Sequence, residues 1–333
     1  MPRFALSPYY HPTTVCFVDD NQSFLNSLEL EMPEEWSYRG FVEPGLALQF
    51  LQQPPKLAPL VDRCFAFEKH DHEGPIIHLK LGTIEQEINH IARFERVSVA
   101  VIDYAMPLMS GLELCAAIDD RYMQKAMLTG VADEQVAVAA FNDGLIDRFA
   151  AKHKLSSAQE ILAFVGHLQQ VFFNQYTTRL RDTLAMDPPQ FLLDEAIAIR
   201  VRQLMRDRSL IEYYLVDDPP GLLLLNAAGE LFRLLILSVE QLAMQVAFAE
   251  QNAAPAAIVE RLRSGHCVGY FWDTPAHYFG NEPFPWEEHL LPATTLAGTQ
   301  KWYLALAEDP PTDIDFDPQQ SSFNAYLRQR GER

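Results

Sequence analysis

The sequence contains no long apolar run and no closely spaced cysteines, and these two absences limit what the protein can be. A membrane-spanning helix needs about 20 mostly apolar residues, and no such run occurs among the 333 residues. The first residues also lack the apolar stretch of a signal peptide, so we expect a cytoplasmic protein without a membrane partner. The four cysteines form no C-x-x-C pair, and we expect them to be buried free thiols.

Positive charge is also scarce. The chain has 26 Lys and Arg against 45 Asp and Glu, a formal net charge of −19. Residues 155–333 contain 13 Lys and Arg against 23 Asp and Glu, a net charge of −10 for that half. A domain dedicated to duplex DNA neutralises phosphates with clustered cations. The acidic second half therefore argues against such a domain, and no helix-turn-helix with a basic recognition helix is found.

Apolar runs and helix-like segments alternate in the first half of the chain. Short strands are predicted near residues 14–18, 38–42, 97–102, 125–129 and 146–151, with helical patterns between them. This alternation predicts an α/β fold, a doubly wound parallel sheet of five strands. The total length predicts a second domain.

Polar side chains follow the predicted strands. Asp19 and Asp20 end the first strand, Asp103 the third, Thr129 the fourth and Lys152 the fifth. Each alone could be a helix cap or a loop residue, but the carboxyl ends of parallel strands share one edge, where ligands bind. Three carboxylates repel one another without a cation, and oxygen ligands suit Mg²⁺. A carboxylate beside Mg²⁺ and a lysine can accept a phosphoryl group.

Four motifs resemble the receiver domains of two-component response regulators (CheY-like), over about residues 10–155. They are F17-V-D-D20, D103-Y-A-M-P-L-M-S-G111, L128-T-G130 and R148-F-A-A-K152. The resemblance implies a flavodoxin-like receiver domain of signal transduction. It also implies that Asp103 is the phosphoacceptor, which receives its phosphoryl group from a histidine kinase or a phosphotransfer protein.

The same resemblance implies a metal site around Asp103. Asp20 and Asp103 would bind Mg²⁺ directly, and Asp19 would bind it through a water molecule. The backbone carbonyl of Ala105 would provide another ligand.

The resemblance also implies the residues that respond to the phosphoryl group. Thr129 and Lys152 would contact its oxygens. Phe149 would be the switch aromatic, which repacks when Thr129 moves; burial in the strand core would explain it as well.

The sequence departs from the receiver pattern at three residues. His153 stands where a cis proline usually follows the lysine, and a cis bond there would cost about 2.5–4 kcal/mol. The residues two positions after Asp103 and Thr129 are Ala105 and Val131, and neither side chain can orient an attacking water. We therefore predict slow self-dephosphorylation.

About 40 additional residues, near 54–96, are inserted before the third strand. We predict a strand at 76–81 and, from the capping box T83-I-E-Q, a helix from Ile84 to about Ala92. The spacing of His70, His72, Glu73 and His78 fits no standard zinc site, which favours a solvated loop over a metal site. Long ordered insertions are usually functional, and we expect partner recognition or a dimer contact.

A long connecting helix is predicted over residues 155–186, after a receiver domain of residues 1–154. Ile161, Val165, Leu168 and Phe172 alternate spacings of four and three, as in two heptads of a coiled coil. This spacing predicts a homodimer seam, and packing on its own domain is the alternative.

Residues 187–333 predict an α+β output domain. Strands near 211–216, 221–225 and 231–236 are separated by turn sequences and should form an antiparallel sheet. The run E212-Y-Y-L-V-D217 beside this receiver weakly resembles orphan quorum-sensing response regulators, whose output has no standard DNA-binding fold.

Asp187 and Pro188 predict the start of a helix that carries four arginines: Arg200, Arg202, Arg206 and Arg208. These form either a patch that binds an anion, a nucleotide or nucleic acid, or a solvated face paired with nearby acids. Cyclase, phosphodiesterase and glycine-loop motifs are absent, so we expect no enzyme beyond reactions on its own phosphoryl group. A protein or small-molecule output partner is favoured over DNA.

Overall fold

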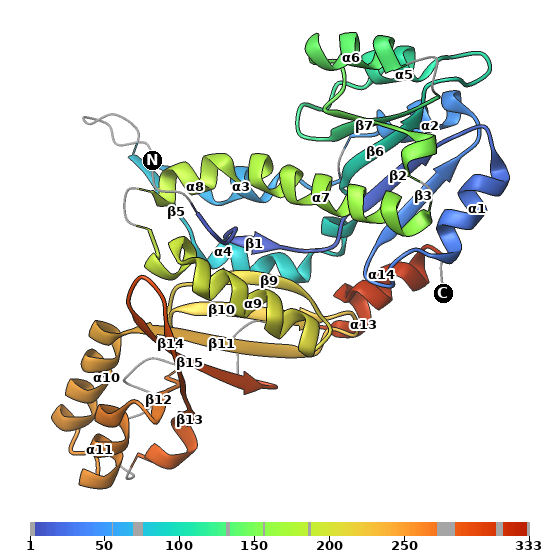
Figure 1. Cartoon of the computed structure of the whole chain (residues 1–333). Coiled ribbons are helices and arrows are strands. Elements are labelled where there is room, and N and C mark those ends of the chain that lie inside the picture. Colours follow the sequence, from blue (N-terminus) through green and yellow to red (C-terminus); the bar gives the residue numbers. More distant parts are fainter. Residues whose placement is uncertain are drawn as a thin grey trace. The chain divides into compact units, whose positions relative to one another are not determined.

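The computed structural model describes residues 4–54, 56–68, 76–130, 134–155, 157–185, 188–271, 284–310 and 316–331, without the side chains of 66–68, 76–79 and 153. The chain forms two compact units, each described by itself (Figure 1). The parallel-sheet unit contains Pro12–Ala58 and Ile91–Thr178. The antiparallel-sheet unit contains Met1–His11, Pro59–His90 and Arg179–Arg333. Within the described ranges, no helix is long and apolar enough to cross a membrane.

The parallel-sheet unit is built on five parallel strands in the order β3-β2-β6-β7-β8. These are β2 (Thr14–Val18), β3 (Ser37–Phe41), β6 (Val97–Asp103), β7 (Gln124–Thr129) and β8 (Arg148–Ala151). The central strands β2, β6 and β7 are buried over nearly all their residues, as expected when helices cover both faces of a sheet. The predicted flavodoxin-like, doubly wound fold is confirmed.

Helices cover both faces of this sheet. One face packs against α2 (Pro44–Leu51), α5 (Gly111–Ala117) and α6 (Glu134–Asn142). The other packs against α1 (Gln22–Leu30) and α7 (Ala158–Tyr176). Two separate apolar cores result, and together they hold the carboxyl ends of the strands in place.

Helix α7 is part of the parallel-sheet unit. Its side chains Ile161, Val165 and Leu168 lie in the core beneath β2 and β6, and Phe172 is also fully buried. They are therefore not available to a second chain, so the predicted homodimer seam is wrong and packing on its own domain is confirmed. The helix is also shorter than predicted, because α7 ends at Tyr176 and a separate helix, α8, follows (Thr178–Leu184).

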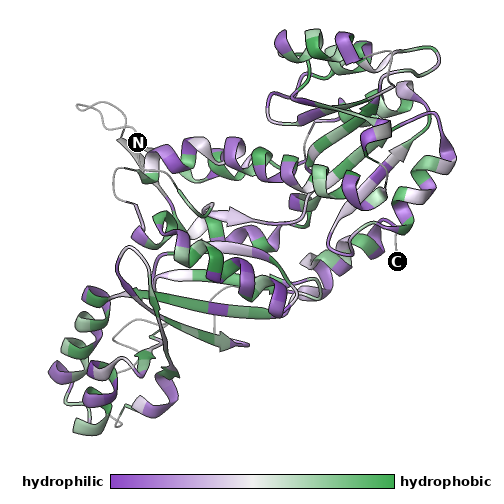
Figure 2. Ribbon diagram, viewed as in Figure 1, coloured by the Kyte–Doolittle hydropathy of each residue, from purple (hydrophilic) through white to green (hydrophobic). Residues whose placement is uncertain are grey.

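The antiparallel-sheet unit contains a six-stranded sheet in the order β1-β9-β10-β11-β15-β14. Its strands are β1 (Tyr9–Tyr10), β9 (Leu210–Val216), β10 (Gly221–Asn226), β11 (Leu231–Ser238), β14 (Thr294–Ala297) and β15 (Lys301–Glu308). Strands β10 and β11 are mostly hydrophobic in Figure 2, in agreement with their burial. The predicted α+β domain with an antiparallel sheet is confirmed.

Helices and a small two-stranded antiparallel sheet complete this unit. Helix α10 (Val239–Gln251) begins after a Ser238 capping box. It packs with α11 (Ala256–Ser264) against an apolar cluster that contains Trp286. The remaining elements are α9 (Glu195–Asp207), β12 (Cys267–Gly269), β13 (Leu290–Pro292), α13 (Pro318–Ser321) and α14 (Phe323–Gln329).

The inserted segment belongs to the antiparallel-sheet unit, as do the first residues of the chain. The predicted boundary of the receiver domain, residues 1–154, therefore differs from the observed division. The insertion forms α3 (Leu60–Arg63), a hairpin of β4 (Phe65–Glu68) and β5 (Ile76–Leu79), and the short α4 (Gly82–Glu85). Buried Glu87 forms an ion pair with Arg63 and ties the ends of this segment together.

The insertion helix differs from its prediction. Helix α4 starts after Leu81, without a side-chain cap, and continues only as a 3-10 helix over Gln86–Asn89, so the predicted capping box at Thr83 is wrong. His70, His72 and Glu73 lie outside the described residues.

Helix α9 starts later than predicted. Asp194 caps it by accepting a hydrogen bond from Ala196 N at 2.9 Å, whereas Asp187 lies outside the described residues. The same carboxylate accepts hydrogen bonds of 2.7 Å from Thr299 N, Thr299 Oγ1 and Trp302 Nε1. Burial works to raise the pKa of Asp194, but these hydrogen bonds outweigh it and leave the pKa below its usual value. Asp194 therefore fixes α9 to the β14–β15 hairpin.

Candidate functional site

The carboxyl edge of the parallel sheet gathers the polar residues that the sequence placed at strand ends. Asp19 and Asp20 directly follow β2, and Asp103 is the last residue of β6. Thr129 ends β7, and Lys152 follows β8. Since these four strands are neighbours in the sheet, their ends meet at one place.

Three carboxylates lie close together there, and one ammonium group contacts two of them. Lys152 Nζ lies 2.7 Å from Asp19 Oδ2 and 2.9 Å from Asp103 Oδ1. One carboxylate oxygen each from Asp19, Asp20 and Asp103 lies within 4.8 Å of the others. Asp19 and Asp103 are buried, whereas Asp20 is exposed. The site is thus open on the side of Asp20.

The burial of these charges changes their acidity. Burial raises the pKa of Asp103; the hydrogen bond and charge of Lys152 oppose this, and the charges of Asp19 and Asp20 add to it. Burial lowers the pKa of Lys152, but its contacts with Asp19 and Asp103 outweigh that effect and raise it overall. Lys152 therefore stays charged, and one ammonium group faces three acids. A divalent cation would relieve the remaining repulsion.

Thr129 brings a buried hydroxyl to the same edge. It is fully buried, and its Oγ1 has no hydrogen-bond partner among the described residues. Its neighbour Leu128 is paired with Asp103, and Thr129 itself is paired with Ala151, which precedes Lys152. Thr129 thus lies between Asp103 and Lys152. A buried hydroxyl without a partner is costly, and such groups are found where a ligand supplies the missing partner.

A tight turn follows Asp103 and contains Ala105. Gly111 N donates to Tyr104 O at 3.0 Å and closes the turn. A Cβ at Gly111 would lie 2.3 Å from the carbonyl oxygen of Asp103, so only glycine fits there. Ser110 then caps α5 in a capping box with Glu113. Ala105 lies in the exposed part of this turn.

Phe149 lies on β8, two residues before Ala151. It is half-buried, packs against the core on the α5–α6 face, and meets Phe141 in a T-shaped contact at 6.3 Å. Phe141 itself is exposed.

The structure adds one residue that the sequence analysis missed. The ring of Phe24 lies 5.3 Å from Lys152 Nζ, a cation–π contact. Phe24 is in the first turn of α1, capped by Asn21, whose N–H donates to Asp19 Oδ1 at 3.0 Å. The sequence could have indicated Phe24 as a site residue, because it lies four residues after Asp20, at the start of a helix that leaves the site.

Two departures from the receiver pattern fall where little is described. Val131 lies outside the described residues, and the side chain of His153 is not described. The Lys152–His153 junction begins a 3-10 turn (Lys152–Lys154), and the cis peptide found among the described residues is Asp218–Pro219.

The arginines of α9 belong to the antiparallel-sheet unit. Arg202 pairs with Glu195 at 2.9 Å, and Arg208 pairs with Glu308 at 2.5 Å. Arg200 is half-buried; Arg206 is exposed and has no ion pair among the described residues. Half of the predicted patch is therefore neutralised by neighbouring acids.

Comparisons with known proteins agree with this geometry. The chain is similar to the solved structure of the Legionella pneumophila response regulator LqsR, with 29% identity and a TM-score of 0.78, over 98% of this chain and 96% of that one. A CheY-like receiver domain protein from Methanospirillum hungatei JF-1 is 19% identical over 49% of this chain and 98% of its own, with a TM-score of 0.32. A structure named as an adenylate cyclase from Rhodopirellula baltica is 20% identical over 53% and 98%, with a TM-score of 0.33. No family model and no curated protein matches the sequence. The similarity to the Legionella protein over both units confirms the predicted receiver-domain response regulator.

Proposed function

We propose that this response regulator is switched by phosphorylation of Asp103, with a histidine kinase or a phosphotransfer protein as the donor. The observation that carries the proposal is the contact of Lys152 with both Asp19 and Asp103, beside the buried hydroxyl of Thr129, which has no hydrogen-bond partner in the described part of the chain. This set offers a nucleophile, a cation and a free hydrogen-bond donor at one point. Phosphoryl transfer requires mainly such positioning and charge neutralisation.

The chemical step forms an acyl phosphate on Asp103. A carboxylate oxygen of Asp103 attacks the phosphorus of a phosphohistidine, a P–O bond forms and the P–N bond breaks. The imidazole nitrogen leaves with the electron pair and takes up a proton. Lys152 and Thr129 would hold the phosphoryl oxygens through the charged and the hydroxyl donor.

The acid cluster also fits Mg²⁺. Three carboxylates in close contact, one of them exposed, form an all-oxygen ligand set of the kind this ion prefers. Asp20 and Asp103 would bind it directly, Asp19 through water, and Ala105 through its backbone carbonyl. When bound, Mg²⁺ would neutralise the charge that builds up on the phosphoryl oxygens.

The output follows from repacking around the acyl phosphate. The phosphoryl group adds about two negative charges at the end of β6. The Thr129 hydroxyl can move toward this group and donate a hydrogen bond to it. Phe149 can then shift into the space that Thr129 leaves. Thr129 and Phe149 would thus have one arrangement before phosphorylation and another after it, and this change would shift the conformational equilibrium of the rest of the chain. The antiparallel-sheet unit would respond by binding a protein or a small ligand, or by forming a homodimer through a surface other than α7.

The test of this function uses acetyl phosphate as the donor and measures both directions of the reaction. We expect incorporation into the wild-type chain with Mg²⁺ and none into Asp103→Asn or without the metal. Because Ala105 cannot orient water, we also expect the acyl phosphate to persist for many minutes after the donor is removed. Loss of the label within seconds would contradict this part of the account. Light scattering with and without beryllofluoride then tests whether the dimer forms on activation.

A second candidate function is binding of nucleic acid or a nucleotide through α9. The observation in its favour is the exposed Arg206, which has no ion pair among the described residues. Binding through it would weaken steeply with salt and would be abolished by charge reversal at Arg202 and Arg206. Affinity that does not change with salt would reject this function.

A further inference from the structure

Lys152 has three partners at the acid site, and one of them carries no charge. Its Nζ lies 2.7 Å from Asp19 Oδ2, 2.9 Å from Asp103 Oδ1 and 5.3 Å from the centre of the Phe24 ring. The last distance is that of a cation–π contact. The Lys152 side chain is 36% exposed, so burial alone does not hold its ammonium group in the site.

These contacts form a closed ring that does not include Asp103. Asn21 N–H donates to Asp19 Oδ1 at 3.0 Å, and Phe24 N–H donates to Asn21 Oδ1 at 3.1 Å. The Phe24 side chain contacts Lys152, whose ammonium group in turn contacts the other oxygen of Asp19. The backbone at the start of α1 therefore positions both the Asp19 carboxylate and the aromatic ring that contacts Lys152.

Phe24 is also held in place by packing. The residue is half-buried and packs against the apolar core on the α1–α7 face of the sheet, next to the buried Leu25. Turning the ring away from this core would expose apolar surface to water. The ring is thus a fixed partner, whereas Lys152 carries its charge on a long, flexible side chain.

The two charged partners of Lys152 are also the groups that the proposed reaction uses. Asp103 would accept the phosphoryl group, and Asp19 and Asp103 belong to the acid cluster that fits Mg²⁺. A metal ion that prefers oxygen ligands competes with an ammonium group for such carboxylates, but it does not bind an aromatic ring. Among the described residues, Phe24 is therefore the one partner of Lys152 that neither the metal ion nor the phosphoryl group can replace.

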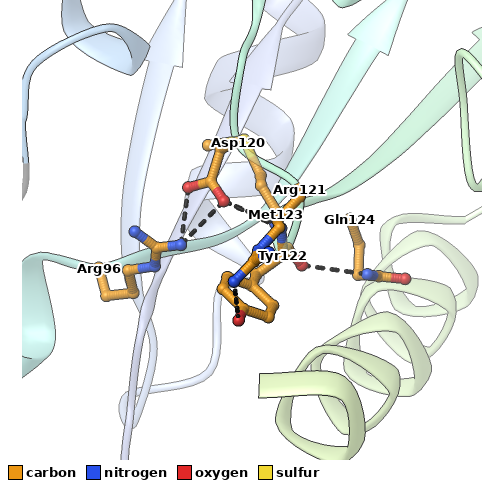
Figure 3. A network of polar contacts seen from close by, with 6 residues as sticks. All are labelled: Arg96, Asp120, Arg121, Tyr122, Met123 and Gln124. Atoms are coloured by element: carbon orange, nitrogen blue, oxygen red, sulfur yellow. Dashed lines mark hydrogen bonds and ion pairs between the residues drawn. The ribbon is translucent and has the colours of Figure 1, made fainter. Parts of the chain in front are cut away.

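A second cation of the same unit shows that an acid and a ring around a cation are not by themselves a sign of function. Arg96, which precedes β6, pairs with Asp120 at 2.7 Å (Figure 3) and lies 5.3 Å from the ring centre of Tyr176. Asp120 also accepts two backbone N–H groups of the loop that follows it, and it belongs to no acid cluster among the described residues. No step of the proposed function changes the partners of Arg96, whereas phosphorylation changes those of Lys152.

We propose that Phe24 is a positioning residue for Lys152. Its ring keeps the ammonium group at the site while Lys152 exchanges the Asp103 carboxylate for a phosphoryl oxygen. Without the ring, Lys152 turns into water more often during this exchange and is less often placed to neutralise the phosphoryl charge. The inference rests on the proposed function for the exchange itself. The loss of a partly exposed cation–π contact corresponds to about a two- to fivefold change in rate.

Labelling of the full chain by acetyl phosphate in the presence of Mg²⁺ tests the effect on the reaction. Phe24→Leu should label about two- to fivefold more slowly than the wild type, and Phe24→Tyr, which keeps an aromatic ring, should label at close to the wild-type rate. Phe164→Leu is the matched control, because Phe164 is half-buried and packs against the same apolar core from α7. It should lose as much stability in denaturant unfolding as Phe24→Leu does, and label as the wild type.

Nuclear magnetic resonance of the lysine side chains measures the position of Lys152 without a phosphoryl donor. A methylene group held over an aromatic ring resonates upfield of the same group in water, and the Lys152→Arg variant assigns the signal. At saturating Mg²⁺, the Lys152 ε-methylene signal should stay upfield in the wild type and in Phe24→Tyr. In Phe24→Leu it should move to the position of the exposed lysines.

Four outcomes would overturn the proposal. Phe24→Leu could label as fast as the wild type, Phe24→Tyr could label as slowly as Phe24→Leu, or the Lys152 signal could be the same in Phe24→Leu and the wild type. Equally slow labelling of Phe164→Leu is the fourth, since packing of the core and not the contact with Lys152 would then set the rate. If no chain labels at Asp103, the proposed function fails, and the role of Phe24 is judged on the Lys152 signal alone.

Discussion

Replacing Asp103 with asparagine should stabilise the metal-free protein. The variant removes one of three negative charges that lie within 4.8 Å of one another, and it keeps nearly the same side-chain volume. Burial raises the pKa of Asp103, so its ionised form is less favourable in the folded chain than in the unfolded chain. The acid that the proposed reaction requires therefore lowers stability when no cation is present.

The size of the effect follows from the distances. The three carboxylate oxygens lie within 4.8 Å of one another, so at an effective dielectric constant of about 20 each repulsion of Asp103 by Asp19 or Asp20 is at least about 3.5 kcal/mol. The attraction of Asp103 to Lys152 at 2.9 Å is about 6 kcal/mol on the same basis. The two repulsions, of about 3.5 kcal/mol each, exceed the single attraction of about 6 kcal/mol, and the net repulsion is about 1 kcal/mol. We therefore expect Asp103→Asn to raise the free energy of unfolding by about 1 kcal/mol at neutral pH.

Denaturant unfolding followed by circular dichroism, with and without Mg²⁺, measures this difference. The gain should vanish at saturating Mg²⁺, because the ion binds the wild-type site and not the variant. It should also shrink as the pH falls through the raised pKa of folded Asp103, where the wild-type acid becomes neutral. Asp143→Asn, an exposed acid of the same unit, is the control and should show neither effect. A variant that is less stable than the wild type without metal, or a gain that persists with Mg²⁺, would refute the reasoning.

Three further substitutions test the site and its support. Thr129→Val removes a buried hydroxyl that has no partner among the described residues, so it should raise the free energy of unfolding by about 1–2 kcal/mol. It should also slow labelling by acetyl phosphate, and a loss of stability would count against this reasoning. Gly111→Ala places a methyl group against the Asp103 carbonyl and should lower both stability and the labelling rate, whereas unchanged labelling would show that the turn can move. Asp194→Ala leaves four donors unpaired and should cost about 3 kcal/mol in thermal unfolding. The pKa of folded Asp194 is lowered, so its contribution to the free energy of unfolding should be present above the usual pKa of an aspartate and lost as the pH falls below it. An effect of Asp194→Ala that does not depend on pH would contradict this.

The sequence allowed the parallel sheet and its acid edge to be predicted, because both depend on local patterns. Each strand is a short apolar run, and Asp103, Thr129 and Lys152 come at or directly after strand ends, where parallel topology brings them together. No long-range information was needed. The roles of these residues came from the resemblance of the motifs, and they remain predictions until phosphorylation is measured.

Other features depend on contacts between distant segments, and the sequence did not reveal them. The heptad spacing of Ile161, Val165 and Leu168 fits a dimer seam and burial under a sheet equally well, and only the fold distinguishes the two. The insertion joins the antiparallel-sheet unit through long-range packing, which no local pattern records. Asp194 could have been recognised as a helix cap, but its bond to Trp302 spans 108 positions.

The most direct test of the central claim is the identity of the residue that carries the phosphoryl group. The wild-type chain is incubated with acetyl phosphate and Mg²⁺, the acyl phosphate is trapped by borohydride reduction, and peptides are mapped by mass spectrometry. We expect a single modified site at Asp103, absent in Asp103→Asn and greatly reduced in Lys152→Met. Modification at another residue, or equal incorporation into Asp103→Asn, would contradict the account.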